Sequence, residues 1–312
     1  MNSLLRCSNE CLLLWAGDMA LTAPPRLPPS LLPVSRRISG LLHGDYSGLL
    51  HRAGSEIGDT RRYMEGDDVR RIDWPATART NETQVHDTIA DHELEAWLVV
   101  DTSASMKFGT GKISKAQMAN DVAGAFGYLI SHTGNRLGCI TTALSADSLM
   151  PRSGTHQLAQ VLGRLAKTAD SAGTLTQALE KCLSASTRRG LVVVVSDFYD
   201  ESPWQNAMSQ LAQKHDVIAV AISDRREHEF LDVGVVEFRD AETGKTVRID
   251  TSQAEWRNNF AASAQQRHQK ITNDIRLARA DGLSLCADED WVAQLATFLR
   301  TRKRRLAMGH RR

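Results

Sequence analysis

Uninterrupted apolar segments alternate with segments of helical periodicity in the middle of the chain. Residues 96–100 (AWLVV), 190–197 (GLVVVVSD) and 216–223 (DVIAVAIS) are apolar almost throughout. This pattern is typical of strands that are covered on both faces of a parallel sheet. Residues 135–144 (NRLGCITTAL) predict another strand, and 147–151 (DSLMP) predict a short strand that pairs with it as a hairpin.

Between these strands the apolar residues recur every three or four positions, which predicts amphipathic helices. Such series follow residue 113 and occur at 158–165, 175–183 and 204–211. Strands and helices in alternation indicate a doubly wound α/β fold with a mostly parallel sheet and right-handed crossovers. We assign this core to residues 93–224.

The sequence on either side of the core has a different character. Residues 1–36 contain a Pro-rich segment and predict a disordered leader, in which Met19 is an alternative start; residues 37–92 predict a charged N-terminal arm. Residues 225–312 predict an additional hairpin, a long polar helix, a last strand near GLSLCAD (282–288) and a final helix. This helix ends in a basic tail, which we expect to be solvated. In an alternative interpretation its charges bind an anionic membrane surface or nucleic acid. The basic residues of the tail are Arg300, Arg302, Lys303, Arg304, Arg305, Arg311 and Arg312.

Composition narrows the class of protein. The chain has 312 residues and a formal net charge of +1, which argues against nucleic-acid binding driven by bulk electrostatics. No apolar run reaches the roughly 20 residues that a membrane-spanning helix needs. The five cysteines form no CxxC pair, which predicts a reducing compartment. We therefore expect a cytoplasmic protein with no transmembrane segment and no specific nucleic-acid partner.

Oxygen-bearing side chains stand at three predicted loops. Asp101, Ser103 and Ser105 follow the first apolar strand, Asp197 ends the strand of residues 190–197, and Thr174 begins a helix. Ligands of open α/β sheets bind beyond the carboxyl ends of the strands, and a carboxylate with two hydroxyls suits Mg²⁺. In the alternative interpretation the hydroxyls cap helices and the carboxylates accept hydrogen bonds from loop amides.

This set of residues resembles the metal-ion-dependent adhesion site of von Willebrand factor A domains. The upstream block RRYMEGDDVRRIDWPATART (61–80) resembles the signature of a bacterial family that is catalogued only as a domain of unknown function. That family has an A-type domain and is often encoded beside MoxR-type AAA+ ATPases, and the resemblance spans about residues 37–300. It implies Mg²⁺ (or Mn²⁺), completed by an acidic side chain of a partner and held by Asp101, Ser103, Ser105, Thr174 and Asp197.

The resemblance implies recognition of a protein partner and no bond-making. The partner it implies is a MoxR-type ATPase, with a chaperone-like role in assembling or activating an unknown client protein. The alternatives are a metal-dependent phosphoryl hydrolase and a scaffold without a metal. An aspartyl phosphatase would need a second Asp where Ser103 stands, and GTGK (109–112) lacks the first Gly and the Ser/Thr of a P-loop, so we expect no enzymatic activity.

Two further features have open interpretations. Phe198 stands where many A domains have glycine, and it either narrows access to the ion or packs beneath the loop. The block EGDDVRRIDW predicts a turn and a short helical segment ended by Pro75. It is either a structural clasp between the arm and the A domain, or a docking face with these candidate residues: Arg70, Arg71, Trp74 and Arg79.

Overall fold

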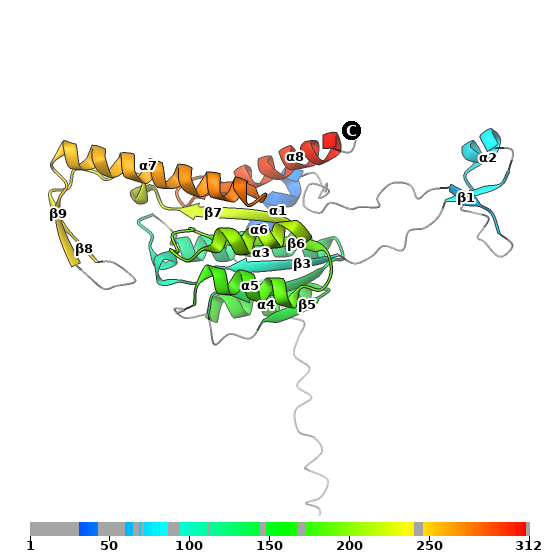
Figure 1. Ribbon diagram of the computed structural model, residues 1–312, viewed down its shortest axis with the longest axis horizontal. Coiled ribbons are helices and arrows are strands. Elements are labelled where there is room, and N and C mark those ends of the chain that lie inside the picture. The colour runs from blue at the N-terminus through cyan, green and yellow to red at the C-terminus, as the bar shows by residue number, and fades with distance from the viewer. Residues whose placement is uncertain are drawn as a thin grey trace, which may run out of the picture.

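The computed structural model describes residues 31–42, 60–64, 69, 72–80, 82–86, 94–111, 113–143, 148–167, 173–239 and 246–309. A six-stranded sheet of order β10-β7-β6-β3-β4-β5 forms the centre of the core (Figure 1). Neighbouring strands are parallel except β4 and β5, which are antiparallel. This topology confirms the predicted fold class. The strands are β3 (Glu95–Val100), β4 (Arg136–Thr141), β5 (Leu149–Arg152), β6 (Gly190–Ser196), β7 (Asp216–Ser223) and β10 (Asp281–Cys286).

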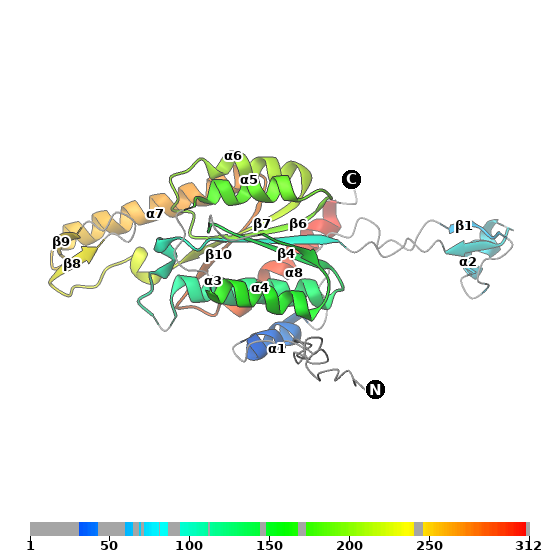
Figure 2. The same cartoon turned by 90° about the horizontal axis from the view of Figure 1, so that it is seen from below.

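Helices cover both faces of this sheet, as Figure 2 shows. In β3, Ala96, Leu98 and Val100 pack against one layer of helices, whereas Trp97 and Val99 pack against the other. Successive side chains of a strand point to opposite faces, so a strand between two helical layers must be apolar at every position. One layer contains α1 (Leu31–Leu42), α3 (Lys115–His132), α4 (Thr155–Lys167) and α8 (Trp291–Gly309); the other contains α5 (Leu175–Ala185), α6 (Trp204–Lys214) and α7 (Ala254–Leu277).

The N-terminal boundary of the folded core differs from the prediction. Residues 31–36, which we expected in a disordered leader, form the first half of helix α1. Ile38 and Leu42 on this helix are buried in the same apolar cluster as α3 and α8. Apolar residues spaced four apart give the helix an apolar face, and the burial of this face against the core stabilises the helix. The prediction of disorder was based on the Pro-rich sequence and did not take this burial into account. Residues 1–30 lie outside the described residues.

The C-terminal boundary at residue 224 is also too early. Strand β10 pairs with β7 in parallel register, from Asp281 opposite Ile218 to Cys286 opposite Ser223. Leu283 and Leu285 point into the core beneath α8. The edge strand β10 and the covering helices α7 and α8 therefore belong to the core, although we predicted residues 225–312 to be an addition to it.

One member of the basic tail is not solvated. Arg302 on α8 has a side chain only 1% exposed, and its guanidinium contacts Asp216 at 2.5 Å and Asp281 at 2.7 Å. Arg305 also reaches Asp281, at 3.1 Å, but is largely exposed. The helix thus anchors to β7 and β10 through a buried cation, which corrects the prediction for this residue; Arg304 is exposed as expected.

The charged arm contains a small unit of its own. Strand β1 (Thr60–Arg62) pairs antiparallel with β2 (Gln84–His86), and α2 (Trp74–Thr80) packs against β2. The block contributes Ile72, which bridges to Val85, and the Asp73 amide, which donates to the Gln84 carbonyl at 2.9 Å. The described part of the block therefore pairs with β2 of the arm.

The predicted hairpin is present as β8 (Val235–Arg239) and β9 (Thr246–Asp250). It lies beyond the edge of the sheet, at the start of the long helix α7 (Figure 1). Phe230, Trp256 and Phe260 pack together at its base, with ring centroids 4.5–5.5 Å apart. Within the described part of the chain, no helix is both long and apolar enough to span a bilayer.

Candidate functional site

The topology brings the first and third predicted loops together. From β3 the chain continues to β4 on one side and returns with β6 on the other side. Such a reversal of strand order opens a crevice at the carboxyl ends of the strands. Val100 pairs with Val195, so Asp101 and Asp197 follow adjacent strands at this edge.

Asp101 is buried and held by three donors. Its carboxylate accepts hydrogen bonds from the Ser196 hydroxyl at 2.6 Å, the Ser103 amide at 2.9 Å and the Thr142 hydroxyl at 3.3 Å. Burial and the nearby Asp197 charge raise its pKa above the ordinary value, although these hydrogen bonds oppose the shift. The carboxylate is therefore fixed in place at an electrostatic cost.

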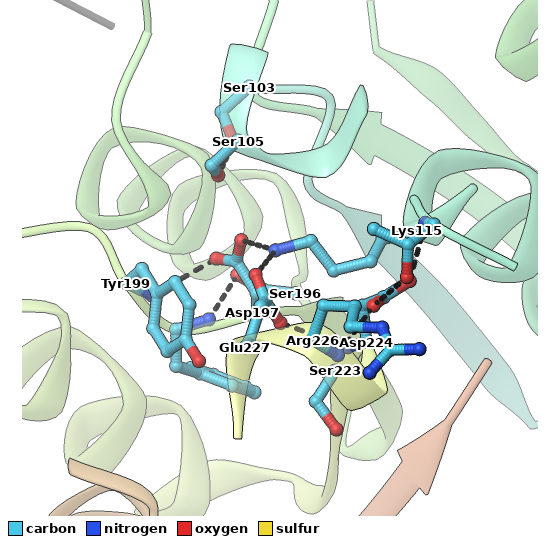
Figure 3. A network of polar contacts seen from close by, with 12 residues as sticks. Ser103, Ser105, Lys115, Ser196, Asp197, Tyr199, Ser223, Asp224, Arg226 and Glu227 are labelled. Atoms are coloured by element: carbon cyan, nitrogen blue, oxygen red, sulfur yellow. Dashed lines mark hydrogen bonds and ion pairs between the residues drawn. The ribbon is translucent and has the colours of Figure 1, made fainter. Parts of the chain in front are cut away.

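The hydroxyls of Ser103 and Ser105 point toward each other, with their oxygens 3.0 Å apart (Figure 3). Ser103 stands at the N-cap of a short 3₁₀ helix, η2 (Ala104–Lys107), but its side chain makes no capping bond. The two hydroxyls are hydrogen-bonded to each other. Adjacent ligands of an octahedral Mg²⁺ at about 2.1 Å are also roughly 3 Å apart, so the spacing of this pair is compatible with a cation site. The capping alternative is wrong for Ser103.

The Asp197 carboxylate carries an unforeseen partner, Lys115 at the start of α3 (Figure 3). The ammonium lies 2.7 Å from Asp197 Oδ2 and 2.5 Å from Glu227 Oε1, and the Lys115 side chain is fully buried. Burial alone lowers a lysine pKa, but the two carboxylates outweigh it and raise the pKa of Lys115, so the group is charged. The other Asp197 oxygen accepts from the Tyr199 amide at 3.0 Å.

Thr174 has the role that the capping alternative gave it. Its hydroxyl accepts from the Gln177 backbone amide at 3.2 Å, and the Thr174 backbone amide donates to the Gln177 side-chain oxygen at 3.1 Å, which forms a capping box for α5. The Leu175 amide at the same helix start donates to Asp200 at 2.5 Å. A hydroxyl oxygen keeps a second lone pair, so capping and a further contact are compatible.

Phe198 packs beneath the loop. It is buried, and its ring lies 4.9 Å from that of Trp204 at a tilted angle. Its φ of 58° is rare for a bulky side chain. The burial of this ring against Trp204 and a 2.9 Å bond from its amide to the Ser196 hydroxyl hold that backbone.

A fourth loop joins the site, after β7. Asp224 accepts from the amide and the hydroxyl of Thr110, at 2.9 and 2.7 Å, and so fixes the end of the Gly-rich exit from the first loop. Burial raises the Asp224 pKa, but these bonds, with one from the Arg226 amide, outweigh it and lower the pKa. The rule that located Asp101 also applies to Asp224, because it directly follows a buried strand; Lys115 gave no comparable signal within its helical pattern.

The donor set fits a magnesium ion in its oxygen chemistry. Ser103, Ser105, Thr174 and Asp101 offer hard oxygens. In Asp197, Oδ2 is engaged by Lys115 and Oδ1 accepts from the Tyr199 amide, so the ammonium competes with a metal ion for this carboxylate. Among the described residues, no three His, Cys, Asp or Glu side chains gather into a metal-binding group. Of the donors named here, three are hydroxyls and Asp101 is the carboxylate without a lysine partner in the contacts described.

The candidate docking residues in the arm are only partly described. Trp74 is 68% exposed at the start of α2, and Arg79 is exposed in its last turn. Arg70 and Arg71 lie outside the described residues. Tryptophan and arginine are each common anchors of protein interfaces.

The sheet and the loops at its carboxyl edge define a doubly wound α/β protein with a mostly parallel sheet and one antiparallel edge strand. The chain belongs to the family described as "Protein of unknown function DUF58", whose model matches residues 59–270. The uncharacterized protein Rv1480 of Mycobacterium tuberculosis (strain ATCC 25618 / H37Rv) is 38% identical over 295 residues, which cover 92% of this chain and 93% of that protein.

Several solved structures are similar at low identity. A conserved hypothetical protein BatB from Bacteroides thetaiotaomicron is 13% identical, covers 68% of this chain and 99% of its own, and has a TM-score of 0.42. The SpRpn10 VWA domain is 10% identical, covers 65% and 93%, and has a TM-score of 0.36. The fold assignment rests on the sheet topology of this chain.

Proposed function

We propose that the protein is a metal-dependent protein-interaction module. In this proposal Ser103, Ser105 and Thr174 hold Mg²⁺ or Mn²⁺ at the carboxyl edge of β3 and β6, with Asp101 and Asp197 as the nearby negative charges. The bound ion supplies Lewis acidity that attracts a carboxylate of a partner protein. The pair of convergent hydroxyls 3.0 Å apart is the observation that carries the proposal.

The site residues of the chain have distinct roles in this scheme. Ser196 and Thr142 orient Asp101, which fixes the loop that presents the serine hydroxyls. Asp224 holds Thr110 and thereby the exit of the same loop. The side chains present recognise and position; the scheme includes no bond-making, and we propose that the domain has no enzymatic activity of its own.

The proposed partner is a MoxR-type AAA+ ATPase, by the family resemblance of the sequence. The proposed role is chaperone-like assembly or activation of a client protein, in the cytoplasm, where the ATPase has its nucleotide. The exposed Trp74 and Arg79 of the arm offer a second contact surface for such a partner or client.

The test is a binding measurement with the ATPase. The affinity of purified protein for the MoxR-type ATPase is measured in Mg²⁺ and in EDTA, for wild type and for Ser105→Ala. The control is Ser209→Ala, because the Ser209 hydroxyl bonds only to the Gln205 carbonyl within α6, away from the site. We expect binding in Mg²⁺ to weaken at least tenfold in EDTA and in Ser105→Ala, and to remain unchanged in Ser209→Ala.

Two results would contradict the proposal. Equal binding in Mg²⁺ and EDTA would favour the scaffold alternative, which the capping box of Thr174 and the Lys115–Asp197 ion pair also support. No binding in either condition would refute the ATPase as partner and leave the cation site to be tested by direct titration.

A further inference from the structure

A buried cation belonging to the chain itself lies at the proposed metal site. The Lys115 ammonium bonds Asp197 at 2.7 Å, and Asp197 is the carboxylate that directly follows β6 at the edge of the sheet where the site is proposed. A second carboxylate, Glu227, lies 2.5 Å from the same nitrogen on its other side.

The surroundings of Lys115 favour a positive charge at this point. The ring of Tyr199 lies 5.0 Å from its nitrogen and the ring of Phe108 lies 5.9 Å away, both within the range of cation–π attraction. Arg267 of α7 lies over Tyr199 as well, at 5.2 Å. Four groups from three segments of the chain therefore surround the lysine, which is not a solvated surface charge.

Glu227 connects this cation to a separate segment. It ends the 3₁₀ turn η3 (Arg225–Glu227), and its other carboxylate oxygen accepts from the Asp224 amide at 2.9 Å. Asp224 in turn binds Thr110 of the first loop. The ammonium therefore bridges the loop that presents the site and the segment that leads toward the β8–β9 hairpin and α7.

We propose that Lys115 is the resident cation of the site, which competes with a divalent metal ion for the Asp197 carboxylate. When Asp197 turns toward the metal, Glu227 keeps the Lys115 ammonium paired. This inference rests on the proposed function, and it assigns the regulation of the same site. Lys115 lowers metal affinity by neutralising Asp197 and by repelling a second cation. Glu227 opposes this by offering the ammonium an alternative carboxylate.

The two residues therefore have opposite effects on metal binding. Mn²⁺ affinity is measured by titration calorimetry and by the loss of the free Mn²⁺ electron paramagnetic resonance signal. We expect Lys115→Met to bind Mn²⁺ at least about tenfold more tightly than wild type, because one adjacent positive charge is removed. We expect Glu227→Gln to bind at least about threefold more weakly, because the ammonium then has Asp197 as its only carboxylate partner in the pair.

The matched control is Lys107→Met, which removes an exposed lysine from η2, in the same loop region. We expect its Mn²⁺ affinity to stay within about twofold of wild type, because solvent and salt screen an exposed charge. A second readout is thermal unfolding with and without Mn²⁺, in which Lys115→Met should gain more from the metal than wild type. Glu227→Gln keeps the shape and the oxygen that accepts from Asp224, so it tests the proposal even if Lys115→Met folds poorly.

The outcomes separate this inference from the proposed function. If wild type, Lys115→Met and Lys107→Met bind Mn²⁺ equally, or if Glu227→Gln binds more tightly than wild type, the resident-cation proposal is refuted while the metal site stands. If neither wild type nor Lys115→Met binds Mn²⁺, the metal site itself is refuted, and the inference falls with it.

Discussion

Arg302 gives the sharpest test of how the C-terminal segment is joined to the core. Replacing it by Met keeps an unbranched apolar side chain but removes the charged guanidinium of a side chain that is 1% exposed. Asp216 of β7 and Asp281 of β10 then lose their common partner at 2.5 and 2.7 Å. The two strands are neighbours in the sheet; Asp281 keeps its contact with the exposed Arg305 at 3.1 Å, whereas Asp216 loses the buried cation that it shared with Asp281.

The size of the effect follows from the exposure of those carboxylates. Removing one partner of a buried ion pair costs about 3–5 kcal/mol. Asp216 and Asp281 retain 29% and 26% of their side-chain exposure, so water can partly solvate them and the lower end applies. We expect Arg302→Met to lower the free energy of unfolding by about 3 kcal/mol, which corresponds to a fall in Tm of about 6–12 °C for a domain of this size.

The assay is urea unfolding followed by tryptophan fluorescence, which reports the buried Trp97, Trp204 and Trp291. The control is Arg304→Met on the exposed face of the same helix, for which we expect a change below about 0.5 kcal/mol. The difference between the variants should persist in high salt, because buried pairs are screened much less than exposed ones. Equal stability of the two variants would refute the assignment of Arg302 as a buried anchor.

Three further predictions concern single positions. His215 is buried, and its pKa is lowered to about 4, mainly by burial and then by Lys214 and Arg189. As pH falls, the unfolded chain therefore binds a proton on this residue before the folded protein does. The free energy of unfolding should fall by up to about 3 kcal/mol as pH falls from about 6.5 toward 4. Urea unfolding at pH 7 and 4.5 should show this loss in wild type and a smaller one in His215→Asn; equal losses would contradict it. A Cβ on Gly190 would lie 1.9 Å from the Glu95 carbonyl oxygen, so Gly190→Ala should destabilise the protein by about 1–3 kcal/mol in thermal unfolding. A Cβ on Gly163 in α4 would meet open space, so Gly163→Ala should stabilise the protein by about 0.5–1 kcal/mol. The reverse order of stability would refute the close approach at Gly190. Asp101→Asn should abolish metal binding and raise the free energy of unfolding at pH 7. The pKa of Asp101 is raised in the folded protein, so above the ordinary aspartate pKa the charged carboxylate costs stability that Asn does not cost. The extra stability of the variant should shrink as pH falls through the raised pKa, and a loss of stability at pH 7 would contradict the prediction.

The sequence was sufficient for the fold class and for the edge of the sheet that carries the site. Unbroken apolar strands, such as β3 and β6, reveal burial on both faces, and the residue after each strand then falls at the carboxyl edge. This reasoning placed Asp101 and Asp197 at the carboxyl ends of two strands, and the structure shows that these strands are neighbours. It also applied to Asp224, which we did not include.

Other features depend on contacts that no local pattern reports. Lys115 and Arg302 each occupy a polar position in a helical pattern, where a solvated charge is the ordinary expectation, and each is buried because carboxylates from other segments surround it. Thr174 was expected to begin a helix, which it does, and helix capping was one of the two interpretations of its hydroxyl. Only the structure shows that it forms a capping box. The extent of the core was underestimated because α1 and β10 join it through packing and pairing distant in the chain.

The most direct test of the central claim is a calorimetric titration of the purified wild-type protein with Mg²⁺, beside the double variant Ser103→Ala and Ser105→Ala. The account predicts saturable binding with one ion per chain in wild type and at least a tenfold loss of affinity in the double variant, because the hydroxyl pair at 3.0 Å is removed. Equal affinity in the two proteins would contradict the account and show that any bound ion is held elsewhere.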